Sequence, residues 1–227
     1  MVFLFDVNSI MWNIPWFNYP MSWCEFLGTV FGLWCVWLTA KEKILSWPIG
    51  LVNVIFFLFV FWQVRLYSDV LLQIYFFGTG LYGWWKWQNP NPLEARTVAE
   101  MKVTMNSGKV NFQMFGLILL LTALLGYFMD HANVLMPSVF PEQASYPYWD
   151  ASTSIMSLFA QWLLTKKRLE SWMLWVTADL IDMNLYHLKG VQLISIEYVI
   201  FLFIAIYGLV SWYKSWKKDG RLIANGG

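Results

Sequence analysis

The chain alternates between apolar stretches of about 20 residues and shorter polar segments. Seven apolar stretches are marked out at about residues 21–40, 44–64, 67–87, 112–129, 149–165, 171–189 and 192–213. About 20 apolar residues in a helix cross the ~30 Å hydrocarbon core of a bilayer. Helices satisfy their own backbone hydrogen bonds, which lipid cannot do for them. The pattern therefore predicts an all-α membrane protein with seven transmembrane helices.

The first 18 residues are too short and too polar to add an eighth span. They contain Asp6, Asn8 and Pro15 together with Trp12 and Trp16. Tryptophan side chains favour the headgroup region of a bilayer. We expect residues 1–18 to form an interfacial helix.

Composition agrees with a membrane location and excludes several classes of protein. The chain is 59% hydrophobic and 13% charged, and a soluble protein this apolar could not cover its surface with polar groups. The basic residues are scattered, so nucleic-acid binding is not expected. His131 and His187 make no metal constellation with the two cysteines, and no phosphate-binding glycine loop is present. We expect no metal, no cofactor and no enzymatic activity.

The distribution of lysine and arginine predicts the orientation. With seven crossings, only Arg65 and Lys189 of the 15 basic residues fall on the same side as the N-terminus. The other 13 fall on the opposite side, and basic residues favour the cytoplasmic side. The sequence predicts an integral inner (cytoplasmic) membrane protein with its N-terminus outside and its C-terminus in the cytoplasm.

An offset of 125 residues aligns the two ends of the chain without a gap. Under this offset identical residues coincide: Trp37 with Trp162, Lys41 with Lys166, Trp47 with Trp172, Tyr82 with Tyr207 and Trp87 with Trp212. Three spans in each half end on the side opposite their start, so one linker span makes the halves parallel. The prediction is a 3+1+3 fold of two parallel three-helix repeats, as in the SWEET transporters.

These patterns divide the chain into five parts. Their predicted bounds are 1–18 for the interfacial segment, 19–88 for the first repeat, 89–148 for the linker with the fourth helix, 149–214 for the second repeat and 215–227 for a cytoplasmic tail.

The sixth apolar stretch carries the clearest candidate chemistry. Trp172, Trp175, Asp179, Asp182 and Tyr186 are spaced by three and four residues, which places them on one helical face. A charge in the hydrocarbon core costs at least ~2.5–3.5 kcal/mol, so this face should avoid lipid. It either lines a polar cavity that binds a small molecule or pairs with polar groups on a neighbouring helix.

The first half is apolar at the equivalent positions, which are Trp47, Gly50, Val54, Phe57 and Phe61. This asymmetry favours a ligand with one polar and one flat face. Other polar groups at membrane depth are few, and Asn53 and Gln73 serve equally well for helix–helix hydrogen bonds or ligand contact. The full set of candidate substrate-binding residues is Trp47, Asn53, Gln73, Gln161, Trp172, Trp175, Asp179, Asp182 and Tyr186.

Residues 160–190, AQWLLTKKRLESWMLWVTADLIDMNLYHLKG, resemble the signature region of PnuC-type vitamin transporters. The motifs Trp47-Pro48-x-Gly50 and Tyr82-Gly83-Trp84 resemble the first half of that family. The resemblance implies a 3+1+3 fold, import of nicotinamide riboside by facilitated diffusion, and a homotrimer. Members of the family also carry thiamine or riboflavin.

The residues suit nicotinamide riboside, which has a flat pyridinium cation and a ribose. Tryptophan faces attract a cation by ~0.5–2 kcal/mol, and a carboxylate balances its charge or accepts hydrogen bonds from hydroxyl groups. No lysine or arginine lies deep in a span, so a phosphate finds no clamp and phosphorylated forms should bind poorly. The alternatives are a thiamine or riboflavin facilitator, a SWEET-type sugar uniporter, a seven-span receptor and a membrane scaffold.

Overall fold

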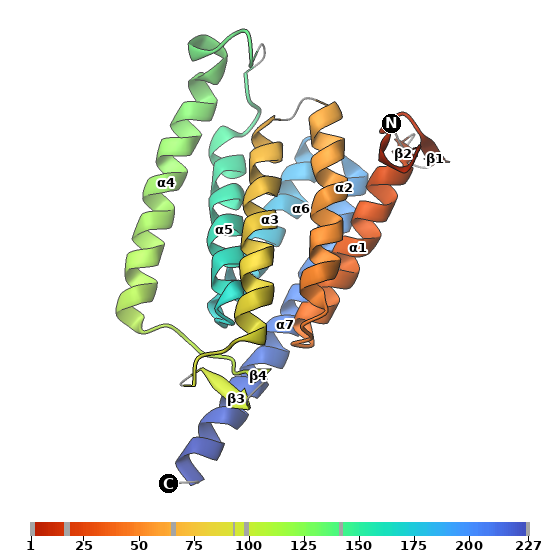
Figure 1. Cartoon of the computed structure of the whole chain (residues 1–227). Helices are drawn as coiled ribbons and strands as arrows, with labels where there is room; N and C mark the ends of the chain where they lie inside the picture. The colour runs from red at the N-terminus through yellow and green to blue at the C-terminus, as the bar shows by residue number, and fades with distance from the viewer. Residues whose placement is uncertain are drawn as a thin grey trace.

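The computed structural model describes residues 3–15, 19–64, 67–92, 94–97, 100–140 and 143–225. Within these residues the chain is mainly helical (Figure 1). The seven helices are α1 (Trp23–Ala40), α2 (Ser46–Gln63), α3 (Tyr67–Gln88), α4 (Gly108–Leu135), α5 (Pro147–Thr165), α6 (Glu170–Leu188) and α7 (Gln192–Asn225). The all-α prediction is confirmed.

Four of the described helices, α1, α2, α4 and α7, are long and apolar enough to cross a membrane. The helices α3, α5 and α6 are less apolar because they carry acids and amides, among them Gln73, Gln161 and Asp179. The expectation of a membrane protein holds.

Two helices run beyond the apolar stretches that predicted them. The helix α4 begins four residues before residue 112 and ends six residues after residue 129, while α7 extends from Gln192 to Asn225. The apolar pattern marks only the part of a helix that faces an apolar environment. Polar residues such as Lys214 and Lys217 continue the same helix because lysine is a good helix former.

The interfacial helix predicted for residues 1–18 is wrong where the structure describes them. A 3-10 turn, η1 (Phe3–Phe5), is followed by β1 (Ile10–Ile14), which pairs antiparallel with β2 (Tyr19–Ser22). The Asp6 carboxylate accepts a hydrogen bond from the Asn8 backbone at 2.9 Å and stabilises a turn instead. Residues 1–2 and 16–18, including Trp16, lie outside the described residues.

The helix start at α1 follows from local sequence. Ser22 caps α1, because its hydroxyl accepts a hydrogen bond from the Glu25 backbone while Glu25 binds back to Ser22. Tyr19 of β2 donates a hydrogen bond to the same glutamate at 2.5 Å. The hairpin is thereby fixed to the first turn of α1.

The helices form two sets of three, with α4 outside them (Figure 1). Within each set the helices pack in chain order, α1–α2–α3 and α5–α6–α7, and the sets meet where α1 packs on α7 and α3 packs on α5. The helix α4 packs mainly on α5. We call α1–α3 the first half and α5–α7 the second half.

The segment between α3 and α4 lies across one end of the bundle. It contains the short antiparallel pair β3 (Ala95–Thr97) and β4 (Glu100–Met101). The residues after β4 then bind the turn between α5 and α6, where Thr104 exchanges backbone hydrogen bonds with Lys167 and Leu169. A group of tryptophans is buried at this end, which we call the tryptophan end.

Candidate functional site

The predicted stripe on α6 faces the interior of the bundle. Trp172, Asp179 and Asp182 are at most 6% exposed, whereas Met173 and Leu180 on the other side of the helix are each 44% exposed. Trp175 and Tyr186 are half-buried. The three-and-four spacing therefore identified the inward face of this helix, and two carboxylates lie on it.

The two aspartates differ in their surroundings. Asp182 has the Thr153 hydroxyl of α5 within hydrogen-bonding reach. Asp179 has no hydrogen-bond or ion-pair partner among the residues that the structure describes. The charged group that acts on it electrostatically is the Asp182 carboxylate. A buried carboxylate without a partner is costly, and a cationic or hydroxyl-bearing ligand would supply one. Asp179 is therefore the better candidate for ligand contact.

The far end of the stripe is built around Tyr186. Its ring stacks on the ring of Tyr198 from α7, with centroids 5.4 Å apart and planes inclined by 16°. The Lys189 ammonium lies 5.3 Å from the centre of the Tyr186 ring and binds both oxygens of Asp150 at 2.7 and 2.8 Å. The basic side chain that contacts Tyr186 is thus already paired with an acid.

Tyr198 was missed by the sequence reasoning, although a signal for it existed. It lies 125 residues after Gln73, so the offset that aligns Trp47 with Trp172 also aligns the polar Gln73 with Tyr198. Both side chains are on the third helix of their halves. Applying the offset to every intramembrane polar residue, rather than to identical residues alone, would have found it.

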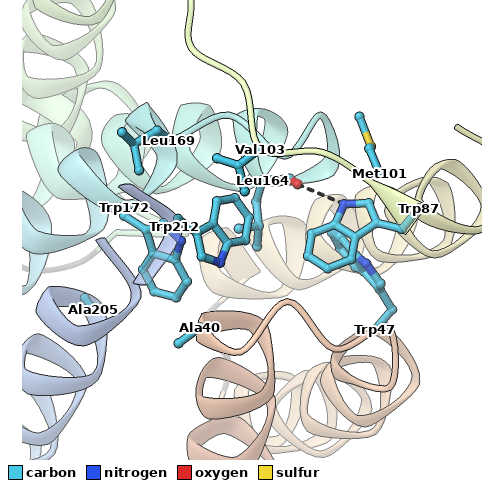
Figure 2. Packing of buried hydrophobic residues seen from close by; sticks show 10 residues of the cluster. All are labelled: Ala40, Trp47, Trp87, Met101, Val103, Leu164, Leu169, Trp172, Ala205 and Trp212. Atoms are coloured by element: carbon cyan, nitrogen blue, oxygen red, sulfur yellow. Dashed lines mark hydrogen bonds between the residues drawn. The ribbon is translucent and has the colours of Figure 1, made fainter. Parts of the chain in front are cut away.

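The tryptophan cluster, which we define as Trp47, Trp87, Trp172 and Trp212, is buried at the tryptophan end (Figure 2). Trp47 meets Trp87 edge to face at 5.3 Å, and Trp172 meets Trp212 in the same way at 5.6 Å. The Trp87 indole donates to the Leu164 carbonyl at 3.2 Å, and the Trp212 indole donates to the Thr39 carbonyl at 3.1 Å. The partners in these two bonds are also 125 residues apart.

The cluster explains the positions of two predicted binding residues. Trp47 and Trp172 are at most 5% exposed and pack against other tryptophans. Gly83 and Gly208 allow this packing, because a Cβ atom at these glycines would lie 2.2 Å and 2.7 Å from the two rings. Trp175 is partly buried against the cluster and lies one turn before Asp179, so it forms the border between the cluster and the carboxylates.

The three predicted amide residues lie in different settings. The Asn53 amide donates to the Gly28 carbonyl at 2.8 Å and joins α2 to α1. Gln73 is buried on α3 and Gln161 is half-buried on α5, and neither has a hydrogen-bond partner in the described part of the chain. The structure therefore assembles Trp175, Asp179, Asp182 and Tyr186 on one face and gives Asn53 a helix–helix contact.

An ion-pair network that the sequence did not predict joins the two halves at the tryptophan end. Glu42 and Lys167 occupy equivalent turns, both with positive φ (57° and 51°), and their charged groups are 2.7 Å apart. Arg96 lies 3.4 Å from the Glu42 carboxylate and 2.9 Å from that of Asp219. Burial acts to raise the pKa of Glu42, but Lys167, Ser215 and Arg96 together hold it below its ordinary value.

The described residues contain no group of three or more His, Cys, Asp or Glu side chains placed to hold a metal ion. The side chains of the candidate site are aromatic rings, carboxylates and amides. Such groups bind and orient a small polar molecule.

Comparison with known proteins points to one family. Residues 22–214 match the family model described as nicotinamide mononucleotide transporter. The chain is 33% identical to the nicotinamide riboside transporter PnuC of Escherichia coli K12, over 95% of this chain and 96% of that protein. It is 21% identical to the riboflavin/roseoflavin transporter RibM of Streptomyces davaonensis, over 92% and 93% of the two chains.

A solved structure has the same fold. The crystal structure of the vitamin B3 transporter PnuC superposes with a TM-score of 0.66 at 21% identity, covering 87% of this chain and 83% of that one.

Proposed function

The chain belongs to the PnuC-type family of nicotinamide riboside transporters, and from this premise we propose that it imports nicotinamide riboside by facilitated diffusion. The substrate would bind between the two halves. The observation that carries the proposal is Asp179, a buried carboxylate on an aromatic stripe with no partner among the described residues. A pyridinium cation would supply the missing positive charge. Because its ring is flat and its charge is delocalised, it is weakly hydrated and can be buried beside an aromatic face.

In the proposed binding mode, Trp175 and Asp179 hold the nicotinamide ring. The indole offers a face to the cation and the carboxylate, one helical turn away, offers the counter-charge. The candidates for hydrogen bonds with the ribose hydroxyls are Asp182, Gln73 and Gln161. Tyr186 lies at the end of the α6 stripe opposite Trp172. In this proposal Trp47 and Trp172 support the site through packing, and Asn53 through its bond to Gly28.

The same charges argue against a phosphorylated substrate. A phosphate group would lie near Asp179 and Asp182 and would find Lys189 already bound by Asp150. Like charges at short range disfavour binding. We therefore infer a riboside rather than the mononucleotide named in the family model.

We propose a 3+1+3 architecture of seven spans, with the two halves as parallel repeats and α4 as the linker. Equivalent contacts support it: the exchanged indole bonds of Trp87 and Trp212, and the matched turns at Glu42 and Lys167, all obey the offset of 125. The excess of lysine and arginine at the tryptophan end supports placing this end in the cytoplasm, with the N-terminus outside. A homotrimer, implied by the family resemblance, completes the proposal.

Alternating access follows from where the halves are joined. At the tryptophan end the four indoles of the tryptophan cluster are packed together, and the Glu42–Lys167 ion pair joins the turns of the two halves. Rocking of one half against the other would separate the two turns and open this end to the cytoplasm. The state described here is thus closed toward the cytoplasm in our proposal.

A riboflavin facilitator is the second candidate, because a relative of similar length is named a riboflavin/roseoflavin transporter. The isoalloxazine ring of riboflavin is flat but carries no positive charge. A site that depends on Asp179 as a counter-charge should therefore distinguish it from nicotinamide riboside. Thiamine, which is cationic, is the sharper competitor.

The test is a titration of the purified chain with nicotinamide riboside, its mononucleotide, nicotinamide, thiamine and riboflavin. We expect the riboside to bind best and the mononucleotide at least tenfold more weakly, a difference of about 1.4 kcal/mol. Equal affinity for riboside and mononucleotide would contradict the charge argument. Preference for thiamine or riboflavin would assign the chain to another substrate of the family.

A further inference from the structure

An exposed cluster on the outer surface of the bundle joins α1 to α7 near the tryptophan end. Trp37 of α1 stacks on Tyr207 of α7, with ring centroids 5.1 Å apart and planes inclined by 22°. The Lys41 ammonium, at the end of α1, lies 4.4 Å from the centre of the Trp37 ring. Both rings are at least 40% exposed, so a large part of this cluster faces the surroundings of the protein.

The second half contains an equivalent cluster that joins α5 to α3. Trp162 stacks on Tyr82 at 5.6 Å and 13°, and the Lys166 ammonium lies 4.6 Å from the centre of the Trp162 ring. The offset of 125 converts the tryptophan and lysine of the first cluster into those of the second, and exchanges the tyrosines between the halves. We call the two groups the ring–lysine clusters.

Neither Lys41 nor Lys166 has an acidic partner in the described part of the chain. Most described acids at this end are already engaged, in ion pairs or in hydrogen bonds with asparagine: Glu42, Glu94, Asp219 and Glu170. Further lysines here, such as Lys43 and Lys214, also lack an acidic partner among the described residues. The tryptophan end therefore carries uncompensated positive charge beside exposed aromatic rings.

This combination matches the headgroup region of a bilayer. Exposed tryptophan and tyrosine favour the boundary between hydrocarbon and headgroups, and lysine side chains extend from there toward phosphate. A soluble acidic partner would complement the charge but would not cover rings at this depth. We propose that each ring–lysine cluster binds the headgroup of an anionic phospholipid, with the ammonium on the phosphate and the rings beside the glycerol.

The clusters lie across both contacts between the halves, α1 with α7 and α3 with α5. A lipid bound at either cluster would contact both halves at once. It would therefore favour the arrangement in which these contacts are closed. Anionic lipid would stabilise the closed tryptophan end.

The experiment measures lipid retained by the full chain in neutral detergent, by native mass spectrometry, together with the melting temperature. Short-chain phosphatidylglycerol and phosphatidylcholine are the two probes, and inorganic phosphate is the third. We expect two phosphatidylglycerol molecules per chain and a raised melting temperature, with little effect from phosphatidylcholine or inorganic phosphate. The double substitution K41Q/K166Q should weaken phosphatidylglycerol binding by about fivefold per lysine removed.

The matched control is K109Q/K214Q, which removes the same charge from exposed lysines that lie over no ring in the described structure. This control variant should still bind two phosphatidylglycerol molecules per chain. Equal binding of the two phospholipids, or equal loss in the control, would overturn the proposal, as would a response to inorganic phosphate as strong as that to phosphatidylglycerol. A single gel-filtration peak for each variant separates loss of the site from loss of folding.

Discussion

The two halves have the same turns at the tryptophan end but different chemistry at their centres. In the first half Gly28 of α1 packs against Phe57 of α2, and an added Cβ at Gly28 would lie 3.0 Å from the Phe57 ring. The equivalent positions in the second half are Thr153 and Asp182, where the hydroxyl lies within hydrogen-bonding reach of the carboxylate. Likewise Val54 corresponds to Asp179. We propose that the frame is duplicated, whereas the two carboxylates of α6 have no counterpart in α2. We interpret the second half as the source of the two carboxylates that recognise the ligand, and the first half as a mainly apolar wall to which Gln73 adds one polar group.

The largest expected effect concerns the turns that the halves share. Lys167→Met would remove the partner 2.7 Å from the buried Glu42 carboxylate and leave it with Ser215 and with Arg96 at 3.4 Å. Breaking a buried ion pair on one side costs about 3–5 kcal/mol, so the melting temperature should fall clearly. Lys43→Met is the control, because Lys43 is exposed and has no ion-pair partner in the described structure. Equal melting temperatures for both variants would show that the pair does not hold the halves together.

The next effect concerns the centre, where the halves differ. Asp179→Asn should weaken riboside binding by about 1.5–3 kcal/mol, the range for losing a hydrogen bond to a charged group. Asp182→Asn should weaken it less, because Thr153 already lies within reach of that carboxylate. Isothermal titration on both variants, with melting temperatures alongside, checks this order. Normal binding with lowered stability for Asp179→Asn would make it a packing residue.

A smaller and equal effect should appear at the duplicated glycines. Gly83→Ala and Gly208→Ala each force a Cβ against a tryptophan ring, Trp47 or Trp172. Overpacking of this kind costs about 1–3 kcal/mol. Thermal unfolding should show similar losses for the two variants and little change in riboside affinity. A loss confined to one of them would mean that the two halves are packed differently.

The smallest effect is a pH dependence at the tryptophan end. The lowered pKa of Glu42 means that its contribution to stability is present above its ordinary pKa of 4.5 and is lost as the pH falls through the lower value. The wild type should therefore melt above Glu42→Gln at neutral pH, with the difference shrinking as the pH falls below 4.5. A constant difference across this range would show that Glu42 does not act through its charge.

Much of this structure could be predicted from the sequence because it depends on local periodicity. Apolar stretches located all seven helices, and spacings of three and four identified the inward face of α6. The pairing of Glu42 with Lys167 could not be predicted from local pattern, because it depends on how two turns 125 residues apart meet. The contact of Tyr198 with Tyr186 could not be predicted for the same reason, because it depends on how α6 and α7 pack.

The N-terminal hairpin escaped prediction for a different reason. Its tryptophans indicated an interface, which says nothing about backbone conformation. The turn at Asp6 and the bond from Tyr19 to Glu25 then favour paired strands over a helix. Asn53 shows that a polar residue at membrane depth does not by itself indicate ligand contact, because its amide donates a hydrogen bond from α2 to α1.

The central claim is that Asp179 recognises the positive charge of the substrate. The most direct measurement compares nicotinamide riboside with its reduced form, which is uncharged and nearly the same shape, on the wild type and on Asp179→Asn. We predict that the wild type binds the cationic form at least tenfold more tightly, about 1.4 kcal/mol, and that the variant binds both forms alike. An unchanged preference in the variant would contradict the claim.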